Sequence, residues 1–274
     1  MKDWLEYPAA DDGLEHTVTG EMKVLPEVWS AQLGNRRDIL VHLPPSYATG
    51  ARRYPVLYMQ DGQNLFDRAT SFAQEWGVDR TMRAAAKRDR VEAIVVGISN
   101  VANQRIDEYS PFADRKLGGG RGDHYLEFVL DTVKPRIDAS FRTLTERAAT
   151  GIIGSSMGGL ISLYAYFRYP DAIGFAGAMS PALWFAERAI FAYLAAEAYS
   201  PGRLYIDAGT LEGPTEVEDV TRLRELLVEK GYRKGRDLLA VIEKGGRHDE
   251  RAWGRRFRKA LPFLLGSTRP ARRR

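Results

Sequence analysis

Alternating apolar and polar side chains mark the first regular stretch of the chain. Residues 28–33 and 38–43 alternate in this way, and Gly34-Asn35 lies between them. A period of two is typical of half-buried strands, and Gly-Asn is a turn signal, so the pattern predicts an antiparallel hairpin. Pro44-Pro45 ends the second strand.

Beyond the hairpin, short apolar runs alternate with segments of helical period. Near-continuous apolar runs are typical of parallel strands covered on both faces, and they occur at 56–59, 93–98, 148–153, 173–179, 204–206 and 238–242. Helices are predicted at 75–87, 124–137, 156–168, 183–198, 216–230 and 249–264. This order predicts an α/β fold, a doubly wound, mostly parallel sheet with a leading antiparallel hairpin.

Composition narrows the class of protein. We find no linker, repeat or low-complexity block, which predicts one domain over 1–274 with a core at about 28–265 and a flexible N-terminal segment. The net charge is +4, and much of it lies in a basic C-terminal tail at 269–274. Elsewhere positive and negative side chains alternate, which argues against a nucleic-acid partner.

The absence of other features excludes several classes. The chain has no cysteine, which excludes disulfides and a cysteine nucleophile. No apolar stretch is long enough to span a bilayer, so no membrane partner is predicted. The first residues lack a positive start followed by an apolar run, and we therefore expect a cytoplasmic protein.

One motif points to chemistry. Gly154-Ser155-Ser156-Met157-Gly158 has the form G-x-S-x-G and lies between a predicted strand and a predicted helix. The glycines permit a sharp strand-to-helix turn that exposes the hydroxyl of Ser156 at its tip. This pattern predicts a nucleophilic serine.

A serine hydroxyl needs a base, and chain order selects one. In this type of fold the histidine follows the serine, and of the four histidines only His248 does so. His248 follows the predicted strand 238–242, whereas His42 is expected at the surface or on an edge strand and His16 near a loose terminus. His124 is expected to begin a helix. No histidine forms a metal-binding pattern with nearby carboxylates, so no metal and no cofactor are predicted.

The base needs an orienting carboxylate, and the oxyanion needs donors. Asp207 and Glu212 follow the predicted strand 204–206, and we prefer Glu212 because it lies on the loop, while Asp207 could still belong to the strand. The backbone N–H of Met157 is one expected oxyanion donor. The N–H of Gln63 is the other, with Gly62 allowing close approach.

Together these residues resemble the putative esterase family of α/β-hydrolases, which includes enterochelin-type siderophore esterases and feruloyl and acetyl-xylan esterases. The resemblance runs from about 28 to 264 and is carried by 57–66, 95–98, 105 with 108–111, 154–159, 179–184, and 246–250 with Trp253. In this family the acid commonly falls three residues beyond a glycine, and Gly209 and Glu212 match that spacing. Some siderophore esterases resemble a Ser-His dyad, which leaves the role of Glu212 open.

The leading hypothesis is a serine carboxylic-ester hydrolase with an acyl-enzyme intermediate and a Ser156, His248 and Glu212 triad. Its substrate would be a small-molecule, glycosyl or siderophore ester. An acyltransferase and a catalytically silent binding protein on the same fold are the alternatives. Arg105 is expected either to attract an anionic substrate or to pair with Glu108 or another acid. The substrate-binding candidates are Gly62, Phe66, Trp76, Arg105, Tyr109 and Trp184.

Overall fold

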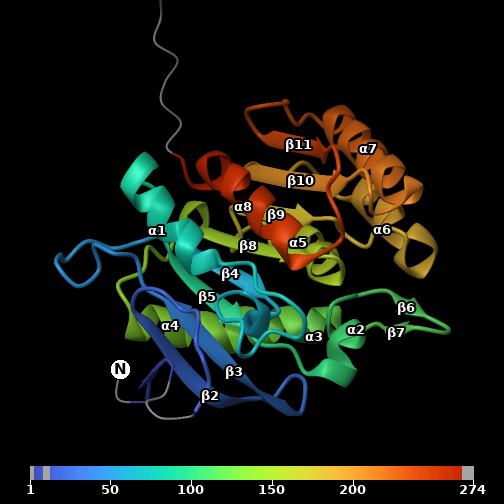
Figure 1. The fold of residues 1–274 in the computed structure, drawn as a ribbon. Coiled ribbons are helices and arrows are strands. Elements are labelled where there is room, and N and C mark those ends of the chain that lie inside the picture. The colour runs from blue at the N-terminus through green and yellow to red at the C-terminus, as the bar shows by residue number, and fades with distance from the viewer. Residues whose placement is uncertain (1–2, 9–12, 267–274) are drawn as a thin grey trace, which may run out of the picture.

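The computed structural model describes residues 3–8 and 13–266, and Figure 1 shows them as a sheet covered by helices. Within these residues nine strands form one sheet in the order β1-β2-β3-β5-β4-β8-β9-β10-β11. The pairings from β1 to β5 are antiparallel, and those from β5 to β11 are parallel. The strands are β1 (Leu5–Glu6), β2 (Met22–Ser30), β3 (Asn35–His42), β4 (Val56–Gln60), β5 (Ile94–Ile98), β8 (Thr150–Ser155), β9 (Phe175–Met179), β10 (Arg203–Gly209) and β11 (Leu238–Glu243).

The observed sheet confirms the predicted doubly wound α/β fold with a leading hairpin, but the hairpin has different limits. Strand β2 begins at Met22, ahead of the predicted residue 28, and the turn spans the residues between Ser30 and Asn35. A bulge between Leu25 and Val28 breaks the alternation and conceals the first half of the strand. Leu33 lies in the turn but is buried, so the alternation of apolar and polar residues continues past the end of β2 and the predicted strand is too long at that end.

Helices cover both faces of the sheet and create two cores. Consecutive side chains of β4 alternate between them, with Val56 and Tyr58 in one core and Leu57 and Met59 in the other. Helices α1 (Val78–Asp89) and α8 (Glu250–Leu265) contribute to the second core. The first core receives α3 (Gly122–Glu127), α4 (Lys134–Ser140), α5 (Met157–Arg168), α6 (Phe185–Ala196) and α7 (Pro214–Glu229).

The long loop after β5 has structure of its own. It contains the short helix α2 (Arg105–Glu108) and a two-stranded ribbon of β6 (Ala113–Asp114) and β7 (Gly118–Gly119). A π-helical segment, Phe128–Val133, joins α3 to α4, so the predicted helix at 124–137 is present as one interrupted run. Interruptions of this kind are frequent near functional sites.

His42 is the clearest departure from expectation. It lies on β3, which has β2 and β5 on its two sides, and its side chain is fully buried. The ring stacks on Phe66 with 6.2 Å between centroids. Burial, with the positive charge of Arg83, lowers the pKa of His42 to about 4. The prediction of a surface or edge position was therefore wrong, because the second half of β3 is buried on both faces.

The two ends of the chain contribute differently to the described structure. The sheet begins at β1, well before the predicted core, and β1 pairs with β2. The basic tail at 269–274 lies outside the described residues. Among the helices that are described, none combines the length and apolar character needed to cross a bilayer.

Candidate active site

Ser156 occupies a strained position between a strand and a helix. Strand β8 ends at Ser155, α5 begins at Met157, and Ser156 between them has φ 56° and ψ −122°. A non-glycine residue with positive φ is costly and persists only where the surroundings enforce it. A side chain at Gly154 would lie 2.5 Å from the carbonyl oxygen of Gly158, which explains the glycine there. The sequence motif therefore folds as a tight turn with Ser156 at its tip.

His248 lies on the loop between β11 and α8 and is held by Glu212. Its Nδ1 donates to Oε2 of Glu212 at 3.1 Å. The histidine side chain is 40% exposed, whereas the carboxylate is fully buried. Glu212 follows β10 on a loop, and its second oxygen, Oε1, accepts from the backbone N–H of Gly209 at 2.8 Å. One oxygen thus anchors the carboxylate and the other orients the ring.

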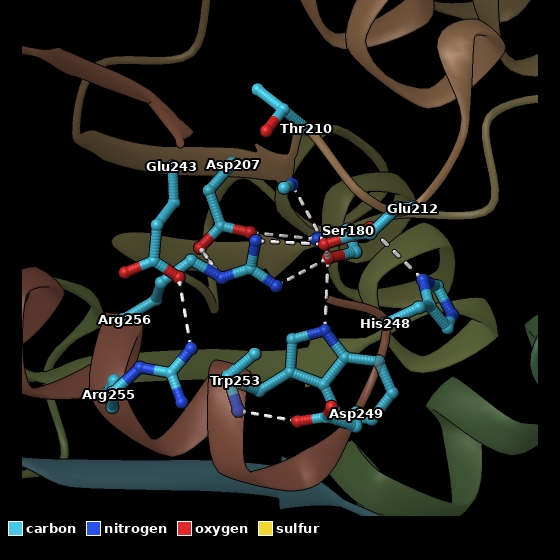
Figure 2. Close-up of polar contacts among 12 residues, drawn as sticks. Ser180, Asp207, Thr210, Glu212, Glu243, His248, Asp249, Trp253, Arg255 and Arg256 are labelled. Carbon is cyan, nitrogen blue, oxygen red and sulfur yellow. Dashed lines mark hydrogen bonds and ion pairs between the residues drawn. The ribbon is translucent and has the colours of Figure 1, made fainter. Parts of the chain in front are cut away.

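Arg256 of α8 lies behind the carboxylate and is fully buried (Figure 2). Its Nη1 donates to Oε1 of Glu212 at 2.9 Å. Burial alone would raise the pKa of Glu212, but the hydrogen bonds from His248 and Ser180 and the positive charge of Arg256 outweigh it. The pKa of Glu212 therefore lies below its usual value, and the carboxylate stays ionised.

Ser180 completes this network from the end of β9. Its hydroxyl donates to Oε1 of Glu212 at 2.8 Å and accepts from Nε1 of Trp253 at 3.0 Å and Nη2 of Arg256 at 2.8 Å. No role in this network was predicted from the sequence for Ser180, Trp253 or Arg256. One signal was available for Arg256, since it falls on the apolar face of α8 with Phe257 and Ala260.

Asp207, the other candidate acid, belongs to β10 and is fully buried. Its Oδ1 accepts from the backbone N–H of Ser180 at 3.0 Å, and its Oδ2 lies 3.4 Å from Nε of Arg256. Burial raises the pKa of Asp207 to about 6 against the opposing charge of Arg256. Its carboxylate supports the network from behind, and Glu212 is the acid that contacts His248 (Figure 2).

The two expected oxyanion donors lie within the first turn of a helical segment. Met157 is the first residue of α5, so its N–H has no partner within the helix. Gln63 is the middle residue of a 3₁₀ turn, Gly62–Asn64, that follows β4. A side chain at Gly62 would come within 2.7 Å of the backbone of Gly97, so this turn packs directly on β5.

A cavity of about 770 Å³ brings the chemical groups together. Ser156, His248 and Gln63 line it, and so do Trp76 and Arg105 from the predicted substrate-binding set. Other members of that set lie elsewhere. Phe66, Tyr109 and Gly62 are buried outside the lining, and Trp184 is 44% exposed outside it.

The charge of Arg105 is already balanced. Its Nε and Nη2 each donate to Asp61 at 2.8 Å. Glu108, the partner suggested by sequence, instead forms a buried ion pair with Arg37 at 2.8 Å. The acid that pairs with Arg105 is therefore Asp61. No group of three or more potential metal ligands occurs in the described part of the chain.

The fold and this site define the class of protein as an α/β-hydrolase with a serine at the nucleophile turn. The profile of the family described as Putative esterase matches residues 30–264, and the chain belongs to this family. It is accordingly a carboxylic ester hydrolase.

Individual relatives agree with this placement. The chain is 30% identical to the Uncharacterized protein YbbA of Bacillus subtilis over 250 residues, covering 86% of this chain and 95% of that one. It is 31% identical to the siderophore triacetylfusarinine C esterase of Aspergillus fumigatus over 50% of this chain and 47% of that one. The structure of the siderophore hydrolase EstA from Aspergillus nidulans is similar in fold, with a TM-score of 0.72, 18% identity and coverage of 90% and 95%.

Proposed function

We propose that the protein is a serine ester hydrolase that works through an acyl-enzyme intermediate, with Ser156, His248 and Glu212 as its triad. The hydrogen bond between the buried carboxylate of Glu212 and Nδ1 of His248 carries this proposal. His248 shares a cavity with Ser156, which the strained turn holds at the tip of the strand. The proposed nucleophile and base therefore line one cavity, and the proposed orienting acid is buried next to the base.

In the first half-reaction, Oγ of Ser156 attacks the ester carbonyl carbon and its proton passes to Nε2 of His248. The carbonyl electrons move to oxygen, and the N–H groups of Gln63 and Met157 stabilise the resulting oxyanion. When this intermediate collapses, the bond to the alcohol oxygen breaks and His248 returns the proton to that oxygen. Glu212 stabilises the imidazolium formed between these two proton transfers.

In the second half-reaction, His248 removes a proton from water, which attacks the acyl carbon. Collapse releases the carboxylic acid and restores the hydroxyl of Ser156. Among the described residues no hydrogen bond joins Ser156 to His248, so the mechanism requires the two side chains to approach more closely when the ester binds. Catalytic hydrogen bonds commonly tighten in this way.

The relatives support a small-molecule ester as the substrate. Those named for an activity include two siderophore esterases and an endo-1,4-beta-xylanase/feruloyl esterase. A cavity of about 770 Å³ is large enough for such a molecule. We therefore propose a siderophore, glycosyl or other small-molecule ester.

Fluorophosphonate labelling with mass mapping tests the proposed nucleophile. We expect an adduct on Ser156, and we expect Ser156→Ala to lose both the adduct and at least about a thousandfold in kcat. Ser155→Ala is the matched control, because Ser155 is the neighbouring hydroxyl and also lines the cavity. Equal activity in the two variants would contradict the assignment.

A further inference from the structure

The chain before residue 30 lies outside the part that the family profile matches, yet it reaches the active site. We call its described residues, 3–8 and 13–20, the N-terminal strap. In this strap β1 pairs with β2, and the N–H of Tyr7 donates to the carbonyl oxygen of Met22 at 3.2 Å. Tyr7 lines the same cavity as Ser156 and His248.

Tyr7 is held in place by a buried carboxylate. Its hydroxyl donates to Oδ2 of Asp67 at 2.9 Å, and Nδ1 of His16 contacts the same oxygen at 2.5 Å. The backbone N–H of Thr17 donates to Oδ1 of Asp67 at 3.1 Å. Asp67 is only 1% exposed, so two separate parts of the strap converge on one anchored group. The ring of Tyr7 therefore has a defined position at the cavity.

A second anchor fixes the strap further along. Both the backbone N–H and the hydroxyl of Thr19 donate to Oδ2 of Asp79 at 2.7 Å, and Asp79 is fully buried at the start of α1. The hydroxyl of Thr17 donates to Glu75 at 2.7 Å. These bonds attach the strap to the folded core, so it forms a fixed part of the cavity.

Asp67 also connects the strap to the loop and the turn that follow β4. Its Oδ1 accepts from the N–H of Ala69 at 3.1 Å, which shapes the loop that carries Thr70 and Phe72 to the cavity. The hydroxyl of Thr70 donates to the carbonyl oxygen of Gln63 at 2.9 Å. One carboxylate thus organises the strap, a cavity wall and the turn that bears an expected oxyanion donor.

The lining of the cavity indicates what the strap would recognise. Four aromatic residues contribute to it from three segments of the chain, namely Tyr7, Phe72 with Trp76, and Trp253. Aromatic faces and edges bind planar rings favourably, and a cavity of about 770 Å³ is far larger than an acetyl group requires.

We propose that the N-terminal strap is a substrate-recognition element and that Tyr7 is a specificity-determining residue whose ring contacts a bulky aromatic portion of the ester. This inference rests on the proposed function and adds to it. It assigns part of substrate selection to residues outside the matched family core, while the chemistry stays with Ser156 and His248.

Three esters test the inference with the full chain. Ethyl acetate is small on both sides, ethyl cinnamate is aromatic on the acyl side, and 2-naphthylmethyl acetate is aromatic on the alcohol side. In Tyr7→Ala we expect kcat/KM for at least one aromatic ester to fall by about tenfold or more, mainly through KM. The value for ethyl acetate should stay within about threefold of the unaltered protein. Equal losses on all three esters, or no loss on any, would overturn the proposal.

Matched variants separate ring contact from structural support. Tyr7→Phe retains the ring and removes the hydrogen bond to Asp67, so its ester preference should match that of the unaltered protein. If Tyr7→Phe instead shows the same ester preference as Tyr7→Ala, contact between the ring and the ester is refuted. Trp29→Ala removes an aromatic side chain from β2 outside the cavity lining, and it should leave all three values unchanged. Tyr7→Leu replaces Tyr7→Ala if thermal unfolding shows that the alanine variant does not fold, and it carries the same expectation.

The failure of this inference differs from failure of the proposed function. Ethyl acetate turnover that requires Ser156, combined with an unchanged preference in Tyr7→Ala, refutes only the role of the strap. Ethyl acetate turnover that persists in Ser156→Ala refutes the proposed chemistry.

Discussion

At the scale of residues, hydrogen bonds fix the orientation of the buried carboxylate of Glu212. Three donors, from Gly209, Ser180 and Arg256, converge on Oε1 and leave Oε2 to His248. Hydrogen bonds and an adjacent cation favour the ionised form and offset the cost of burial. The carboxylate is therefore held in one orientation, with Oε2 directed at Nδ1 of His248.

Replacing this acid should slow the reaction without unfolding the protein. Glu212→Gln preserves the shape but removes the charge that stabilises a protonated His248, so we expect kcat to fall at least about a hundredfold. Asp207→Asn should cost less than about tenfold, because Asp207 contacts Ser180 and Arg256 but not His248. Steady-state kinetics on one ester, with circular dichroism to verify folding, measure both. The reverse ranking would make Asp207 the acid.

Some of these residues could be predicted from sequence and others could not. The strand-to-helix turn is encoded within five consecutive residues, so the position of Ser156 at its tip was predictable before the fold was known. The sequence favoured Glu212 over Asp207 because of its place on the loop, and β10 does run to Gly209, so that Asp207 lies inside the strand. Ser180 and Arg256 meet only because β9 and α8 pack together, and no local pattern records that contact.

At the scale of elements, the turn after β4 determines the position of the N–H of Gln63, which we propose as an oxyanion donor. Asp61 adopts a left-handed conformation, and the 3₁₀ turn Gly62–Asn64 follows it directly. The turn lies so close to β5 that the backbone of Ile98 is 2.9 Å from the position of a side chain at Gly62. This turn was predictable because it follows an apolar strand, whereas the bulge in β2 disrupts the alternation and led to wrong limits for the hairpin.

Gly62→Ala should displace this turn from the sheet. Overpacking of this kind typically costs about 1–3 kcal/mol of unfolding free energy, and moving the N–H of Gln63 should lower kcat by about tenfold or more. Gly50→Ala is the control, since a side chain there would meet only the carbonyl oxygen of Ser46 at 3.6 Å. Urea denaturation and kinetics report the two effects. An unchanged kcat in Gly62→Ala would contradict the role of the Gln63 N–H as an oxyanion donor.

At the scale of the whole molecule, the second core contains an uncharged histidine against its sheet. His42 stacks on Phe66, a member of that core, and burial lowers its pKa from 6.5 to about 4. In the unfolded chain the same ring binds a proton below about pH 6.5. The unfolded state then holds more protons, so the free energy of unfolding decreases as the pH falls from about 6.5 to about 4.

The free energy of unfolding should fall by about 3 kcal/mol by pH 4 because of His42, since each unit of pKa difference corresponds to about 1.4 kcal/mol. His42→Leu removes the titrating group at similar volume, so its stability should decline less between pH 7 and pH 4.5. His124→Gln changes an exposed histidine and should decline like the unaltered protein. Urea denaturation at several pH values measures all three. Parallel declines in His42→Leu and the unaltered protein would exclude His42 as the cause.

The ion pair between Arg105 and Asp61 has a consequence for which molecules enter the cavity. Asp38 and Glu250 also line it, and among the described residues neither forms an ion pair. Acidic side chains therefore outnumber arginine and lysine side chains in the lining, which disfavours negative charge on an approaching ester. Among the proposed siderophore esters, a neutral or cationic one would therefore enter the cavity more readily than a ferric complex that carries several negative charges. Dissolved salt would weaken this discrimination, so the ionic strength of its surroundings would influence which esters the enzyme accepts.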